Sequence, residues 1–340
     1  MKLFLKNFAL FLVLFTTLLF IKNANAADAT CTVSVNAGIV NFGNLTLINI
    51  ENINIPAILN YTCTNNDLTP RYITVCLSVG DGDGGNGSGN ILPRYMKHTN
   101  DSSARLAFTM TLPGNRLWGS RFISNSNEYK SQEYRVNGRS SFTDSVEINI
   151  SILPNYNNHL AKPGTYINNF NSGHTLMTVQ DRLLSISSDC SSGGSTTGQF
   201  PFKVQATVIP SCEITSTSDI NLGIFSAGNQ NISGTNNFDV RCTNSVPYYI
   251  GLAPSNKNNL GSGIMNGTSG NLDKLSYQLR STNGLEGKIW GNTATSTNVG
   301  NGVSGIGTGS TNTHPIYVTV PQTDVRPDNY SDTVDIRINY

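Results

Sequence analysis

The sequence is poor in charge and in histidine. Only 13% of its 340 residues are Asp, Glu, Lys or Arg, and 22 basic residues stand against 21 acidic ones. Nucleic acids and anionic membranes are bound by clustered Lys and Arg, and the sequence has no such cluster. Four scattered histidines lack the spacing to a second ligand that a zinc site requires: His98, His159, His174 and His314. We therefore expect no nucleic-acid partner and no metal site.

Motifs that carry catalysis are also missing. The sequence has no G-x-S-x-G elbow, no P-loop and no H-E-x-x-H. The segment Asp81-Gly82-Asp83-Gly84 resembles the start of an EF-hand loop, but the acidic residue that completes such a loop is absent, which favours a Gly-rich hairpin connection. An exported hydrolase would need an acid–base pair, and spacing suggests none. We expect no enzyme activity and no cofactor.

The N-terminus has the pattern of a secretory signal peptide. Lys2 and Lys6 precede an apolar run from Phe8 to Ile21, and Ala24-Asn25-Ala26 follows as a small-residue cleavage site. A transmembrane anchor is the alternative, but the run is short and ends at the cleavage site. We predict residues 1–26 to be removed and the remainder to be exported. Loss of three lysines leaves 19 basic against 21 acidic residues.

Gly, Asn, Ser and Thr are abundant, and long helix-period patterns are lacking. This composition is typical of many short strands joined by turns, so we predict an all-β protein. The mature chain of about 314 residues is longer than one sandwich core usually needs, so two domains are expected.

An internal repeat divides the chain in two. Paired cysteines 32 and 30 residues apart each end in Cys-Thr-Asn, at Cys63 and at Cys242. Further landmarks recur in the same order: Val40-Asn41-Phe42-Gly43 with Ile220-Asn221-Leu222-Gly223, Leu106-Ala107-Phe108 with Leu275-Ser276-Tyr277, Trp118-Gly119 with Trp290-Gly291, and Pro163-Gly164-Thr165-Tyr166 with Pro327-Asp328-Asn329-Tyr330. The chain is predicted to be two copies of one all-β domain. Trp118 and Trp290 could stack on sugars, but their recurrence favours a shared core or turn role.

Six cysteines in an exported chain predict three disulfides. The repeat pairs Cys31 with Cys63 and Cys212 with Cys242. Cys76 and Cys190 have no counterpart in the second copy, so we expect them to pair with each other. By the loop-entropy model, each disulfide that closes about 30 residues stabilises the fold by roughly 3–4 kcal/mol.

A Ser/Gly/Thr run from Ser191 to Gly198 marks the boundary between the copies. The predicted domains are 27–198 and 199–340. Just after the boundary, Phe200, Phe202, Val204, Ala206 and Val208 alternate with more polar residues, which indicates a strand with one buried face. This strand, within 199–209, could complete the first domain.

The second copy resembles the spore coat protein U family over its whole length. The resemblance rests on the ordered motifs Cys212, Asn221-Leu222-Gly223, Cys242-Thr243, Leu275-Ser276-Tyr277, Trp290-Gly291, Ile316 to Pro321 and Tyr330 to Val334. That family includes the subunits of archaic, Csu-type chaperone–usher pili. Two such domains in one exported chain resemble a pilus tip adhesin, with an N-terminal binding domain and a C-terminal pilin domain.

The resemblance implies immunoglobulin-like β-sandwiches, of which the second lacks its final strand. A periplasmic pilus chaperone, and then an adjacent pilin subunit, would fill the open groove by donor-strand complementation. An outer-membrane usher and a host or abiotic surface are the other implied partners, and the location is the pilus tip. The expected groove edge is the last strand, with Val334, Ile336, Ile338 and Tyr340. Only Ala27 to Thr30 precede Cys31 after cleavage, which favours the tip over the shaft.

Three connections are more apolar in the first copy than in the second, and we interpret them as adhesive loops that mediate attachment and biofilm formation. They contain Leu47, Ile48, Ile50, Ile53, Phe122, Ile123, Tyr156 and Leu160. The alternative for Leu45 to Ile50 is that they fill a larger core. For the whole protein, the alternative is a non-adhesive structural coat or pilus shaft subunit.

Overall fold

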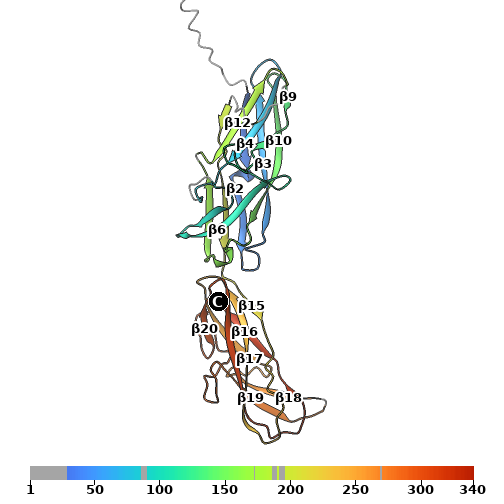
Figure 1. Cartoon of the computed structure of the whole chain (residues 1–340), viewed down its shortest axis with the longest axis vertical. Coiled ribbons are helices and arrows are strands. Elements are labelled where there is room, and N and C mark those ends of the chain that lie inside the picture. Colours follow the sequence, from blue (N-terminus) through green and yellow to red (C-terminus); the bar gives the residue numbers. More distant parts are fainter. Residues whose placement is uncertain (1–28, 86–89, 172, 186–189, 191–195, 269) are drawn as a thin grey trace, which may run out of the picture.

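The computed structural model describes residues 29–85, 90–171, 173–185, 190, 196–268 and 270–340. It is all-β, as predicted, and folds into two β-sandwich units that follow one another along the long axis (Figure 1). The predicted signal peptide lies outside the described residues. Among the residues described, no helix is long and apolar enough to cross a membrane.

The first unit packs a nine-stranded sheet against a five-stranded one. The larger sheet has the order β1-β3-β10-β6-β5-β11-β14-β2, with β7 beside β6, and the smaller has the order β13-β12-β4-β8, with β9 beside β4. The strands are β1 (Ala29–Val35), β2 (Ile39–Leu45), β3 (Asn54–Asn65), β4 (Arg71–Val79), β5 (Arg94–His98), β6 (Asp101–Leu112), β7 (Arg116–Leu117), β8 (Tyr129–Lys130), β9 (Tyr134–Val136), β10 (Ser141–Ile152), β11 (Gly164–Phe170), β12 (Thr175–Arg182), β13 (Thr196–Gly198) and β14 (Phe202–Val208). Two 3₁₀ turns accompany them, η1 (Asn36–Gly38) and η2 (Asn158–Leu160).

The second unit has a six-stranded sheet, β15-β16-β21-β19-β18-β22, and a three-stranded sheet, β20-β17-β23. Its strands are β15 (Cys212–Ser216), β16 (Gln230–Cys242), β17 (Pro247–Pro254), β18 (Ser262–Gly267), β19 (Lys274–Arg280), β20 (Val303–Ile306), β21 (Thr311–Gln322), β22 (Tyr330–Ser331) and β23 (Val334–Asn339). Each unit has a hydrophobic core of its own.

The repeated landmarks make the same contacts in both units. The indole Nε1 of Trp118 donates to the Leu77 carbonyl at 3.0 Å, and that of Trp290 donates to the Ile250 carbonyl at 2.9 Å. Both tryptophans are buried, so the predicted core role is confirmed. Buried indoles need such an acceptor, which explains why the motif keeps its place relative to the neighbouring strand.

Two further landmarks fix the chain at turns. The hydroxyl of Tyr166 donates to the carbonyl four residues earlier, at 2.9 Å, and Tyr330 does the same at 2.8 Å. Asn41 and Asn221 each accept the N–H of a glycine two residues on, Gly43 or Gly223, and both glycines have positive φ. An Asx turn followed by a left-handed residue suits asparagine and glycine, so the same four-residue motif gives the same bend twice.

The three disulfides join Cys31 to Cys63, Cys76 to Cys190 and Cys212 to Cys242, which are the predicted pairs, and the described residues include no free cysteine. Two of them link β1 to β3 and β15 to β16, where the paired cysteines face each other across neighbouring strands. The cysteines that the repeat paired are thus directly opposite residues of neighbouring strands.

Strand β14 lies inside the larger sheet of the first unit. It runs antiparallel to β11, with Phe202 opposite Phe170, and parallel to β2, with Val208 opposite Leu45. Its alternate side chains are at most 3% exposed: Phe202, Val204, Ala206 and Val208. Burying a large apolar side chain contributes about 1.5–3 kcal/mol, so this one strand provides several kcal/mol, comparable with the net stability of a domain.

Replacing Phe202 by Ala should destabilise the first unit by about 3–5 kcal/mol, because its ring is stacked on Phe170 with centroids 4.6 Å apart. Each core holds one tryptophan, so denaturant unfolding of the Trp290→Phe background reports the first unit through Trp118. Lys203→Ala, next to it on the outward face, is the control and should change stability by less than about 0.5 kcal/mol. Equal effects of the two substitutions would contradict the buried position of Phe202.

Pulling on the two ends of the first unit should lengthen it little, because disulfides close segments of 32 and 114 residues. Reduction should add about 500 Å of contour length, at roughly 3.5 Å per residue. The Cys76→Ser/Cys190→Ser variant should add about 400 Å without reductant. Single-molecule force spectroscopy measures both lengths, and equal extension before and after reduction would contradict the prediction.

Candidate functional site

The second unit has a groove where the first unit holds β14. In the first unit β14 fills the gap between β11 and β2. Their counterparts in the second unit are β22 with the residues after it, and residues 219–225. Among the described residues, no strand lies between these two segments. A cavity of about 880 Å³ occupies the place, with side chains from both segments on its walls.

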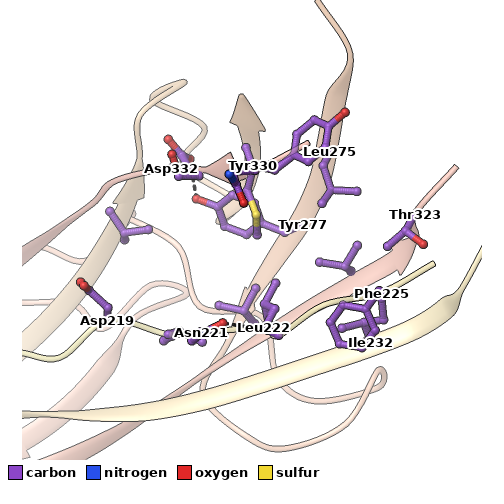
Figure 2. A pocket seen from close by; sticks show the side chains of 18 of the residues that line it. Asp219, Asn221, Leu222, Phe225, Ile232, Leu275, Tyr277, Thr323, Tyr330 and Asp332 are labelled. Atoms are coloured by element: carbon purple, nitrogen blue, oxygen red, sulfur yellow. Dashed lines mark hydrogen bonds between the residues drawn. The ribbon is translucent and has the colours of Figure 1, made fainter. Parts of the chain in front are cut away.

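The floor of the groove is apolar and comes from the larger sheet of this unit. Figure 2 shows Leu275 and Tyr277 from β19 facing it from one side and Ile232 from β16 on the other. The strands of this sheet also contribute Phe238, Met265, Leu279, Ile316, Val318 and Val320 to the lining. A sandwich strand with an alternating apolar face would cover these side chains, as β14 does in the first unit.

The segment beside the groove is more exposed than its counterpart in the first unit. Leu45 of β2 is fully buried against β14, whereas Phe225, which takes its place in the second unit, is 43% exposed. Ile224 is fully exposed. Residues 217–225 form no regular strand, although β2 does. We attribute the difference to the missing neighbour, because a strand edge without a partner loses its ladder hydrogen bonds.

One end of the groove is acidic. Asp219 and Asp332 both line it there, on the same side of the view in Figure 2. The hydroxyl of Tyr277 donates to Asp332 Oδ2 at 2.6 Å. Burial, followed by the bond to this carboxylate, raises the pKa of Tyr277 well above its ordinary value, so the phenol stays protonated as a donor.

The other end holds a network of charged and polar groups. Asp328 accepts hydrogen bonds from Thr268 and Asn271, and these bonds lower its pKa to about 2. Arg326 binds Asp273 through its side chain at 3.0 Å and through its backbone N–H, which lowers the pKa of the Asp273 carboxyl. Arg326 is the basic residue of the lining.

Two of the four residues predicted for the groove edge line the cavity. Val334 and Ile336 line the cavity, whereas Ile338 and Tyr340 lie outside its lining. All of β23 pairs with β17, and Ile338 packs against the core of the second unit. The sequence interpretation missed the opposite wall, formed by Ile220, Leu222 and Phe225. The internal repeat could have identified this wall, since the three residues correspond to Val40, Phe42 and Leu45, which are buried in β2.

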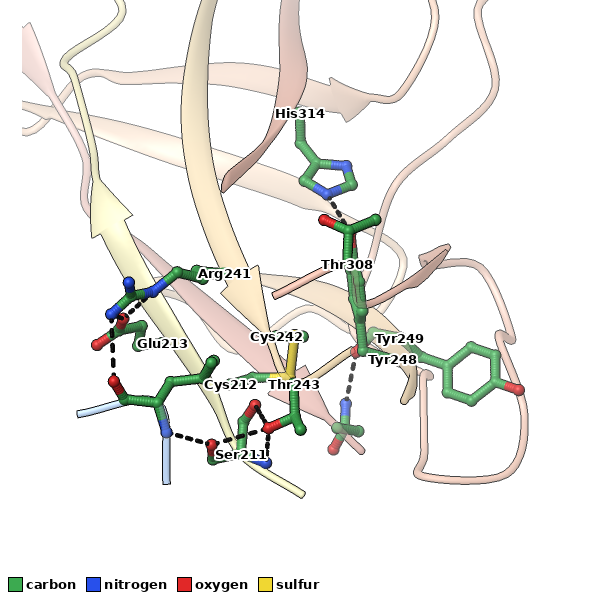
Figure 3. The surroundings of a disulfide bond; sticks show 12 residues. Ser211, Cys212, Glu213, Arg241, Cys242, Thr243, Tyr248, Tyr249, Thr308 and His314 are labelled. Atoms are coloured by element: carbon green, nitrogen blue, oxygen red, sulfur yellow. Dashed lines mark hydrogen bonds and ion pairs between the residues drawn. A yellow bond between two sulfur atoms is a disulfide. The ribbon is translucent and has the colours of Figure 1, made fainter. Parts of the chain in front are cut away.

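The linker is fixed to the second unit beside its disulfide (Figure 3). The N–H of Ser211 donates to Thr243 Oγ1 at 3.0 Å, and the N–H of Thr243 donates to the Ser211 carbonyl at 2.9 Å. Arg241 forms an ion pair with Glu213 in the same region. These bonds hold residue 211 against β16 directly before Cys212.

Two of the predicted adhesive loops touch the second unit. The N–H of Leu47 donates to Ser211 Oγ at 3.1 Å, and the side-chain amide of Asn244 donates to the Leu160 carbonyl at 2.7 Å. The loops that contain Leu47 and Leu160 therefore lie at the junction between the units, because β2 and β14 both end there.

The adhesive assignment is wrong for Leu47 and Ile50. Their side chains are 6% and 1% exposed, and Ile53 packs, partly buried, against the same core. Ile50 belongs to the larger core of the first unit, which was the alternative for Leu45 to Ile50. Leu47 lies outside that core and is buried at the junction, where its backbone contacts Ser211. Of the remaining residues predicted for the adhesive loops, Ile123 is partly exposed and the other four are exposed: Ile48, Phe122, Tyr156 and Leu160.

The fold and the groove define an all-β protein of two sandwich units, one of which is open to a further strand. Residues 198–337 match the family model of the spore coat protein U domain. This match covers most of the second unit and agrees with the sequence resemblance. No curated protein matches the chain.

Several solved structures resemble the chain. A chain of the CsuC–CsuE chaperone–tip adhesion subunit pre-assembly complex of Acinetobacter baumannii is 15% identical, with a TM-score of 0.49, and the match covers 92% of this chain and 100% of that one. The CupB6 tip adhesin of Pseudomonas aeruginosa is 10% identical, with a TM-score of 0.32 and coverage of 91% and 93%. CfaE, the adhesive subunit of CFA/I fimbria of enterotoxigenic Escherichia coli, is 12% identical, with a TM-score of 0.31 and coverage of 72% and 71%.

Proposed function

We propose that this protein is a subunit of a chaperone–usher pilus, positioned at the pilus tip, that attaches the cell to a surface and has no enzymatic role. The observation that carries the proposal is the empty groove of a spore coat protein U domain, beside a first unit that has the corresponding strand in place. A periplasmic chaperone and an adjacent pilin would each supply that strand in turn, and an outer-membrane usher would export the assembly.

The use of β14 supports the tip position. A shaft subunit must both accept a strand and donate one. In this chain the strand with a donor pattern, Phe202–Val208, is buried between β11 and β2 of its own first unit. The chain thus offers one groove to a partner and retains its own donor-type strand.

Filling the groove should stabilise the second unit and keep it monomeric. We propose fusing a second copy of residues 199–209 after Tyr340 through a flexible Gly/Ser linker. The fused strand can bury its apolar face in the groove, so the unfolding transition reported by Trp290 should move to higher temperature, and aggregation through the open edge should fall. A fused copy with Val204→Asp is the control, because a charge cannot be buried there. Equal melting temperatures of the two fusion proteins would refute the proposal that the groove accepts a strand.

For the attachment surface we propose the end of the first unit that is distant from the junction. Leu68, Leu183 and Leu184 expose 77%, 59% and 71% of their surface. Leu68 precedes β4, and Leu183 and Leu184 follow β12. The start of β4 lies beside the end of β12, because Tyr72 pairs with Arg182, so the three leucines lie at the same end of the unit. Exposed apolar groups near one another are typical of a binding surface, and they would hold abiotic or apolar surfaces by area.

Changing these three leucines to Ser should reduce attachment of displaying cells to polystyrene severalfold at equal display, because most of the apolar contact area is lost. The matched control is Leu260→Ser/Leu272→Ser, which removes leucines 62% and 81% exposed from the second unit. A Phe122→Ser variant tests the loop that follows Trp118-Gly119, and a Tyr156→Ser/Leu160→Ser variant tests the loop at the junction. Full attachment by every variant would favour the alternative, a non-adhesive coat or shaft subunit.

A further inference from the structure

The first unit shows which neighbours an inserted strand acquires. Lys203 is the first outward-facing residue of β14, between the buried Phe202 and Val204. It is opposite Asn169 in β11 and opposite Ile39 in β2. A strand seated in the same way in the second unit would therefore bring its first outward residue next to the counterpart of Ile39.

That counterpart is Asp219. The motif Ile220-Asn221-Leu222-Gly223 takes the place of Val40-Asn41-Phe42-Gly43, with the same Asx turn in each, so Asp219 corresponds to Ile39. Asp219 is exposed and lines the groove. Its carboxylate makes no hydrogen bond or ion pair with any residue that the structure describes, although its backbone carbonyl accepts one from Asn236.

The charges at the two ends of the groove differ. Asp332 lies with Asp219 at the end where an inserted strand would begin. Arg326 lies at the end where the strand would leave, since it corresponds to Lys162 just before β11. A strand that enters in the reverse direction would bring a basic residue at its start to an end where the charges already have partners, Arg326 with Asp273 and Asp328 with Thr268 and Asn271. It would not meet the carboxylate of Asp219.

We propose that the groove selects a partner strand with alternating apolar residues and a Lys or Arg at its first outward-facing position, where the cation pairs with Asp219. This inference rests on the proposed strand-accepting role of the groove. The apolar face provides most of the affinity, and the ion pair at the solvent-exposed rim distinguishes between strands and fixes the direction of entry.

The test uses the full chain and synthetic peptides of residues 199–209, which carry the alternating pattern and Lys203. Fluorescence anisotropy compares this peptide with its Lys203→Gln and Gln205→Glu forms. Both substitutions lower the peptide charge by one. A residue at position 205 of the bound peptide would lie opposite Asn221 instead of Asp219, because Gln205 lies opposite Asn41 in the first unit. We expect Lys203→Gln to weaken binding about threefold and Gln205→Glu less than about twofold. Lys203→Glu should weaken binding about tenfold.

The Asp219→Asn protein should bind the unchanged peptide and its Lys203→Gln form equally, and about 0.5 M salt should reduce the difference in the unchanged protein. Equal binding of all peptides would overturn the charge preference and leave the strand-accepting groove intact. Equal weakening by the two charge-matched substitutions would also overturn it, since a general charge effect would then suffice. No binding of any peptide would overturn both this inference and the proposed function of the groove.

Discussion

The structure depends on whether a strand lies between β11 and β2, or between their counterparts in the second unit. In the first unit β14 fills this place and buries Phe202, Val204, Ala206 and Val208. In the second unit the same place is a cavity, and the segment that matches β2 is irregular and exposed. One sandwich is thus complete within the chain, whereas apolar core residues of the other line an open groove. An unpaired strand edge and exposed apolar side chains are stabilised by a neighbouring strand, which is why we propose that the second unit accepts one.

The junction between the units explains why the first copy has longer apolar connections. Ile50 extends the core of the first unit, whereas Leu47 is buried at the junction. The backbone of Leu47 and that of Leu160 contact residues beyond β14 and in the second unit. The apolar character of these loops suggests an adhesive surface from sequence alone. Apolar residues are equally needed where two units pack against each other. The distribution of exposed leucines leads us to propose that contact with a surface is made at the opposite end.

The specificity that we propose for this apolar site comes from the charges around it. Most carboxylates there have partners, as in Asp332 with Tyr277 and Asp328 with Thr268 and Asn271. Asp219 corresponds to an apolar residue in the first unit. An apolar floor binds any strand with the right alternation, so discrimination between partners must come from the rim.

The sequence by itself determined the features that repeat. Two copies of the same landmarks predicted two all-β units, the disulfides within each copy and the buried tryptophans, because local turns and strand pairing follow from short motifs. The sequence alone could not distinguish Leu47, which is buried, from Phe122, which is exposed, since both are apolar residues in connections. Only the tertiary structure decided that β2 has a neighbour and that Ile220, Leu222 and Phe225 line an open groove. Exposure depends on what packs against a residue, and that neighbour is distant in sequence.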